Sequence, residues 1–151
     1  MALRQIVKFG EDILRKKSRP VTNFDERLWT LLDDMKETMA AQQGAGLAAV
    51  QVGVLRRAVV IDVRDKHGVI ELINPEIVSA EGTQCGGEGC LSAPNMYENV
   101  ERPNVVTVKA QDRNGKWFKL TGKELLARAI CHEAEHLEGK LFLDRVTKFL
   151  D

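Results

Sequence analysis

The sequence lacks a net charge, since its 22 basic and 22 acidic residues balance. It also lacks the long run of lysine or arginine that is typical of nucleic-acid-binding proteins, so we expect no DNA partner. A short basic cluster lies near the N-terminus and consists of Arg15, Lys16, Lys17 and Arg19. We interpret this cluster as a solvated patch, with a transient contact to the ribosome as the alternative.

Long apolar runs are also absent, and the N-terminal stretch has no apolar core of a signal peptide. We therefore expect a cytoplasmic protein without a membrane partner. Cysteine is scarce and odd in number, at three residues. Because 151 residues bury a sizeable core without crosslinks, free or metal-bound thiols fit better than a disulfide framework. We expect residues 1–151 to form one domain.

Helical spacing of leucine and methionine over residues 26–42 predicts an amphipathic helix. It would begin at Asn23 or Asp25 as N-cap and stop at Gly44. The glycine-rich segment 44–53 is expected to be a loop that leads into a strand over residues 58–63, where β-branched residues follow one another.

The middle of the chain is expected to be rich in strands. Residues 69–73 and 76–80 predict short strands, and Asn114-Gly115 predicts the turn of a hairpin. Thr121 and Glu124 fit a capping box for a helix over residues 125–138, which Gly139 would end. This order predicts an α+β fold, with mixed short β-sheets packed around a C-terminal helix.

The most specific motif is HExxH at residues 132–136, inside that predicted helix. His132 and His136 lie four positions apart, rotated by about 40°, so both imidazoles can reach one metal ion. Glu133 projects beside them, where a carboxylate can take and return the proton of a water molecule. A surface helix with scattered polar residues is the competing interpretation of so short a pattern.

Catalytic metal sites of this kind usually have three protein ligands and one open position. A downstream glutamate, as in gluzincin proteases, has little room, because only Glu138, Asp144 and Asp151 follow the motif. Phe142 stands where a metzincin protease has its third histidine. His67 lies in a polar turn, where a solvated residue is expected. The third ligand is therefore sought among the cysteines.

Cys90 lies in a segment of glycines and small residues, GGEGCLSAP, which allows a thiolate to approach a metal. Cys85 is the rival ligand, although a small buried residue is the simpler interpretation there. Cys131 lies about 100° around the helix from His132 and is expected to pack in the core. From the residues alone, Cys90 is only modestly preferred over Cys85.

Three segments together resemble the peptide deformylase family: GAGLAAVQ at 44–51, EGCLS at 88–92 and HEAEH at 132–136. The resemblance implies a mixed α+β fold and removal of the formyl group from the formyl-methionine of new bacterial proteins. It also implies one divalent metal held by Cys90, His132 and His136, with Fe²⁺ in the cell and Zn²⁺, Ni²⁺ or Co²⁺ as alternatives in the purified protein.

The resemblance also implies roles for residues around the metal. The Gln51 side-chain amide and the Leu91 backbone N–H would stabilise the oxyanion, alongside Glu133 as proton carrier. Gly46 would pair with the substrate like an added strand. Leu125 and Ala129 share a helix face with His132; they would line a methionine pocket or, equally well, belong to the core.

The chain departs from the family pattern at three positions. Glu135 replaces the usual Asp, Cys131 stands where Gln is common, and Tyr97 stands where some members carry an Arg that grips the substrate. No metal ligand is altered, so an active enzyme is expected. The alternatives are a zincin-type metalloprotease, which would cleave internal peptide bonds, and a non-catalytic metal-binding relative.

Overall fold

The computed structural model describes residues 2–148 and contains two antiparallel sheets. One sheet has the order β1 (Gly46–Ala48), β2 (Ala58–Ile61), β3 (Ile70–Glu81), β6 (Val105–Gln111), β7 (Trp117–Lys123). The other has the order β4 (Gln84–Cys90), β5 (Ala93–Arg102), β8 (Val146–Lys148).

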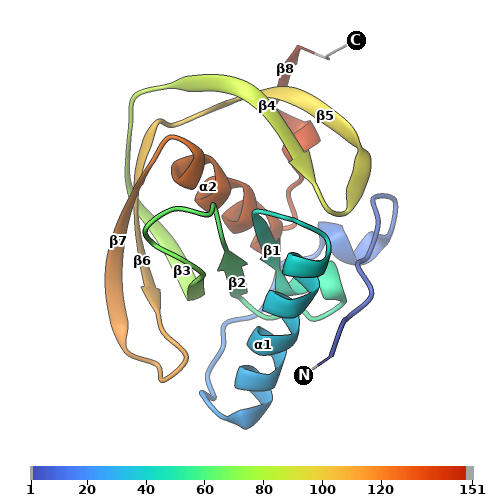
Figure 1. Cartoon of the computed structure of the whole chain (residues 1–151), viewed down its shortest axis with the longest axis vertical. Helices are drawn as coiled ribbons and strands as arrows, with labels where there is room; N and C mark the ends of the chain where they lie inside the picture. Colours follow the sequence, from blue (N-terminus) through green and yellow to red (C-terminus); the bar gives the residue numbers. More distant parts are fainter. Residues whose placement is uncertain (1, 149–151) are drawn as a thin grey trace.

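Helix α2 (Leu125–Leu137) lies in the middle of the molecule, with β6 and β7 on one side and β4 and β5 arching over it (Figure 1). Ten of its thirteen residues are buried, because both sheets pack against it. Its apolar side chains form one core with β2, β3 and β6. The predicted α+β arrangement of sheets around the helix that carries HExxH is confirmed.

Helix α1 (Glu26–Ala41) is amphipathic, as predicted, and packs its leucines and methionines against β1 and β2. Asp25, and not Asn23, is its N-cap, since the Asp25 carboxylate accepts a hydrogen bond from the Leu28 N–H. The prediction that Gly44 stops the helix was wrong. The helix ends earlier, and the left-handed conformation that turns the chain lies at Gln43, whose φ is 55°.

The segment expected to be a loop at 44–53 contains β1 and a 3-10 helix, η2 (Ala49–Val52), before β2. The two short strands expected at 69–73 and 76–80 are one strand, β3, whose register shifts near Asn74 and Pro75. The predicted hairpin is confirmed in β6 and β7, with Gly115 at a φ of +84° in the turn.

The capping box predicted at Thr121 and Glu124 was wrong. Strand β7 continues to Lys123, and the Thr121 hydroxyl hydrogen-bonds to that of Thr107 on β6. Glu124 precedes α2 with a φ of 55° and makes no side-chain cap. Gly139 follows the helix at a φ of +75°, in agreement with the predicted stop. Within residues 2–148, no helix has the length and apolar character needed to cross a membrane.

Candidate metal centre

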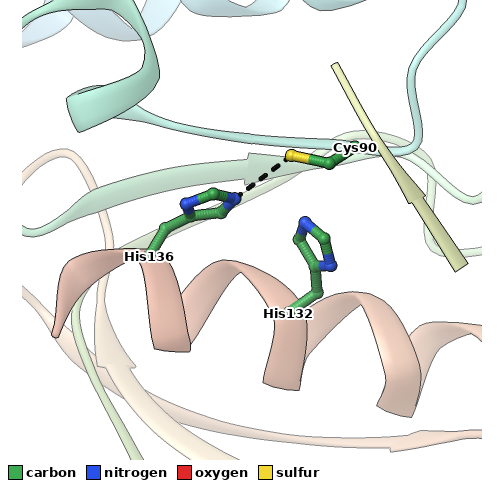
Figure 2. Close-up of side chains that lie close together, drawn as sticks. All are labelled: Cys90, His132 and His136. Atoms are coloured by element: carbon green, nitrogen blue, oxygen red, sulfur yellow. Dashed lines mark hydrogen bonds between the residues drawn. The ribbon is translucent and has the colours of Figure 1, made fainter. Parts of the chain in front are cut away.

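Three potential metal ligands converge at the end of β4: Cys90 from that strand, and His132 and His136 from α2 (Figure 2). Their ligand atoms all lie within 4.8 Å of one another. The Cys90 Sγ is 3.4 Å from the His136 Nε2. Both imidazoles are almost fully buried. One thiolate and two imidazoles form a donor set that suits a divalent transition metal.

A buried carboxylate orients the first of these histidines. The Nδ1 of His132 lies 2.5 Å from the Glu88 carboxylate, which can only accept, so the ring donates there. The Nε2 is thereby left for the metal position, an arrangement typical of metal-bound histidine. Burial raises the pKa of Glu88, but the bonds from His132 and Arg102 outweigh it and lower that pKa to about 2. Glu88 is therefore ionised.

Two arginines complete the surroundings of Glu88. Arg102 donates to both of its oxygens at 3.1 and 2.7 Å, and Arg128 donates to one of them at 2.8 Å. Arg102 also reaches Glu135 at 2.6 Å, so the residue that replaces the usual Asp keeps an ion pair. Neither arginine was predicted from the sequence. The role of Glu88 was also not predicted; the general need of metal-bound histidines for a hydrogen-bond partner does not say which residue supplies it.

Glu133 is buried and lines the cavity beside the three ligands. Its Oε2 is 4.0 Å from the His132 Nε2, and its Oε1 has no hydrogen-bond partner within residues 2–148. Burial raises the pKa of Glu133 to about 7, more than the nearby His132 charge lowers it. A buried oxygen without a partner beside a metal-binding donor set fits a site that holds a metal and a water molecule.

Gly46 lies directly against this carboxylate. A Cβ atom added to Gly46 would fall 2.6 Å from the Glu133 Oε2, closer than real Cβ contacts occur. The bare backbone of β1 therefore lets Glu133 sit between α2 and the strand.

The side chain of Gln51, from η2, also contacts the metal centre. Its Oε1 accepts from the Ala48 N–H at 2.9 Å, and its Nε2 donates to the Ser92 hydroxyl at 3.1 Å. The Nε2 also lies 3.5 Å from the Cys90 Sγ. The amide is buried and held in one orientation, with a long hydrogen bond to the ligand sulfur.

A cavity of about 650 Å³ opens beside the metal centre. Its walls are the segment 42–46, β4, the start of β5 and one face of α2. Gly46, Leu91, Leu125 and Ala129 all line it. Leu125 is 54% exposed there, whereas Ala129 is buried and also contacts the core. A separate cavity of about 460 Å³ beside the start of α1 contains none of the predicted site residues.

The remaining cysteines and the third histidine lie outside the centre. The expectation that Cys85 is buried was wrong: it is exposed on β4, where Asn99 donates to its sulfur. Cys131 is buried in the core, as predicted. His67 is exposed in a turn and hydrogen-bonds to Asp65, also as predicted.

Comparisons with known proteins show which family this chain is similar to. The model of the family described as polypeptide deformylase matches residues 3–150. A peptide deformylase of Caldicellulosiruptor bescii is 58% identical over 150 residues, 99% of this chain and 89% of the relative. The crystal structure of a Legionella pneumophila peptide deformylase superposes with a TM-score of 0.92 at 49% identity, covering 96% of this chain and 86% of that one. For the enzyme of Thermotoga maritima the TM-score is 0.93 at 39% identity, with coverages of 97% and 99%.

Proposed function

The chain belongs to the peptide deformylase family, and from this premise we propose that Cys90, His132 and His136 bind its catalytic metal while Glu133 carries the proton. The protein is a metal-dependent hydrolase that removes the N-terminal formyl group from nascent peptides. The observation that carries the assignment of residues is the convergence of the three ligand atoms within 4.8 Å. We also propose that residues 1–151 form one catalytic domain.

When bound, the metal supplies a Lewis acid that lowers the pKa of a water molecule to about 7. Glu133 accepts the proton of the attacking water and later delivers it to the departing amine. Its buried position beside the ligands supports both steps, because the carboxylate lies near the reacting atoms without being a ligand itself.

Two donors would stabilise the oxyanion of the reaction: the Gln51 side-chain amide and the Leu91 backbone N–H. The contact from Gln51 to the Cys90 sulfur supports the first assignment, because it aims the amide at the metal centre. Leu91 directly follows the ligand cysteine and lines the cavity. Loss of one such donor typically costs about 3 kcal/mol of transition-state stabilisation.

The substrate would lie in the cavity of about 650 Å³. Gly46 would pair with its backbone, since the β1 strand lies at the edge of its sheet. Leu125 and Ala129 would receive the methionine side chain from the helix side, as both line the cavity.

We assign Fe²⁺ as the metal in the cell, while Zn²⁺, Ni²⁺ or Co²⁺ would fit the same ligands. Iron on a thiolate is sensitive to oxygen, so activity should fall in air as the metal or Cys90 is oxidised. Metal analysis with anaerobic and aerobic assays tests this assignment. The assignment of Fe²⁺ would be contradicted if activity were equal with and without air and the protein isolated from cells contained zinc.

The relatives are bacterial, and nascent formylated chains emerge in the cytoplasm, which supports a cytoplasmic location. A transient ribosome contact would bring the enzyme to its substrate, with the exposed basic cluster as its candidate surface. Within that cluster Arg15 is paired with Asp144, and the Lys17 Nζ lies 3.9 Å from the Glu138 carboxylate, which leaves Lys16 and Arg19 as the residues to replace. Cosedimentation of the protein with ribosomes at low and high salt tests the contact.

Formate release from formyl-Met-Ala-Ser tests the proposed roles. Glu133→Ala should lower kcat by at least about 100-fold, since general acid–base catalysis contributes that much, while the metal content is unchanged. Glu37→Ala, on the exposed face of α1, is the matched control and should keep full activity. Equal rates for the two variants would refute the role of Glu133. Cleavage of internal bonds in unformylated peptides would favour a zincin-type protease instead.

A further inference from the structure

An exposed aromatic side chain lies at the rim of the cavity. Tyr97 on β5 is 62% exposed, although its ring lines the cavity together with Met96 and Pro94. Aromatic rings expose a large apolar surface that is stabilised by contact with another apolar group. An unburied ring at the mouth of a substrate cavity is therefore a candidate contact for the substrate.

The ring of Tyr97 is seated on two glycines of β4. A Cβ atom added to Gly87 would fall 2.1 Å from the Tyr97 Cε1 and 2.7 Å from its hydroxyl oxygen. A Cβ atom added to Gly89 would fall 3.3 Å from the Cδ2. The ring thus lies across β4, with its base over Gly89 and its tip over Gly87. The missing side chains of these glycines are what make room for it.

The strand pattern places this ring on one particular face. Glu88 points inward to His132, so its neighbours Gly87 and Gly89 face the opposite side of β4. Tyr97 pairs directly with Gly89 in the ladder and shares its face. The ring therefore lies on the face of the hairpin that points away from α2.

An extended peptide in the cavity would run beside β4. Within residues 2–148, β4 pairs only with β5, so its other edge is available for a further strand. The first residue of the peptide would turn its side chain toward Leu125 and Ala129 on α2. Because side chains alternate in an extended chain, the second residue would then face the side where Tyr97 lies.

We propose that Tyr97 is a specificity-determining residue, which favours substrates with an aromatic or large apolar second residue after formyl-methionine. The inference rests on the proposed function and adds a preference for the second residue of the substrate, which the metal centre does not determine. The contact would be made by the ring and not by the hydroxyl. One face of the ring lies over Gly87 and Gly89, and the exposed ring surface is available beside the cavity.

The ratio of kcat/KM for formyl-Met-Phe-Ser to that for formyl-Met-Ala-Ser measures this preference. In the unsubstituted protein the ratio should exceed one by about 3- to 10-fold, the range that an aromatic contact gives. Tyr97→Ala and Tyr97→Gln should bring the ratio close to one, mainly by lowering kcat/KM for the phenylalanine peptide. Tyr97→Phe should keep the ratio, because it keeps the ring.

Trp117→Ala is the matched control, because it removes another half-exposed aromatic side chain, on β7 and away from the cavity. Its ratio should equal that of the unsubstituted protein. Tyr97 variants that lower kcat/KM for both peptides by the same factor would overturn the inference while leaving the proposed function intact. Absence of formate from either peptide in the unsubstituted protein would overturn both.

Discussion

At the scale of single residues, Gly46 leaves no room for a side chain beside the Glu133 carboxylate. Gly46→Ala should lower kcat by about 10-fold or more, because the new methyl group would push the carboxylate from its place and a small misplacement of a catalytic group is costly. The metal content should stay unchanged, since the three ligands are not touched. Steady-state formate release with metal analysis checks both expectations.

Gly86→Ala is the control for this substitution. A Cβ atom at Gly86 would meet the Arg128 side chain at 3.6 Å, an ordinary contact, and its backbone needs no left-handed conformation. This variant should keep most of its activity. Full activity of Gly46→Ala as well would contradict the prediction that catalysis depends on the observed position of the Glu133 carboxylate.

The carboxylate of Glu88 supports a separate prediction. Glu88→Gln replaces the charged acceptor of His132 with a neutral amide and removes the ion pairs of Glu88 with Arg102 and Arg128. Metal affinity should fall by about 10- to 100-fold, the usual effect of losing such a partner. Competition with a chelator measures it, with Glu71→Gln on β3 as a control outside the site. An unchanged affinity would contradict the role assigned to Glu88.

The sequence predicted the metal ligands better than it predicted the residues that surround and orient them. HExxH and the segment around Cys90 are local patterns, so the spacing of two histidines on a helix already fixes their common face. Arg102 and Arg128 could not be found in the same way. Their contacts to Glu88 join β5, β4 and α2, and such long-range ion pairs depend on the packing of the sheets.

At the scale of secondary-structure elements, the cap of α1 permits a stability prediction. Asp25→Ala should lower the free energy of unfolding by about 1 kcal/mol, because the Leu28 N–H loses its acceptor. Asp25→Ser should recover most of that loss, since serine is also a good N-cap. Denaturant unfolding of the three proteins measures the difference. Equal stability of Asp25→Ala and the unsubstituted protein would show that the cap contributes nothing.

The elements that the sequence predicted are those with local signals. Helix α1 has apolar spacing and a cap, and the β6–β7 hairpin has Asn114-Gly115 in its turn. Strand β4 was missed because its sequence, QCGGEGC, has no β-branched or aromatic residue. It forms through pairing with β5, and its glycines provide space for Tyr97. The false capping box at Thr121 arose because a local motif was outweighed by pairing of β7 with β6.

At the scale of the whole molecule, one ion-pair network joins α1, β3 and the turn after β6. Arg113 contacts Glu71 and Asp33, and Lys36 also contacts Glu71. Burial raises the pKa of Glu71, but the hydrogen bonds from Arg113 and Lys36 outweigh it and keep that pKa below its ordinary 4.5. Folding therefore favours the ionised carboxylate.

A lowered pKa in the folded state means that this stabilisation is present above pH 4.5 and is lost as the pH falls through the pKa of the folded protein. Glu71→Gln should lower the free energy of unfolding at pH 7 by about 1 kcal/mol, with a smaller difference in acid. Glu76→Gln, exposed on the same strand, is the control and should match the unsubstituted protein at pH 7. Thermal unfolding at several pH values measures this; a difference that grew in acid would have the wrong sign.

The position of α2 between the two sheets brings Cys90 to the two histidines, so we expect these three residues to share the coordination of one metal ion. X-ray absorption of the zinc-loaded protein measures it directly. We predict one sulfur at about 2.3 Å, two imidazole nitrogens at about 2.0 to 2.1 Å and one exchangeable oxygen. Absence of the sulfur, or a fourth protein ligand in place of that oxygen, would contradict this coordination.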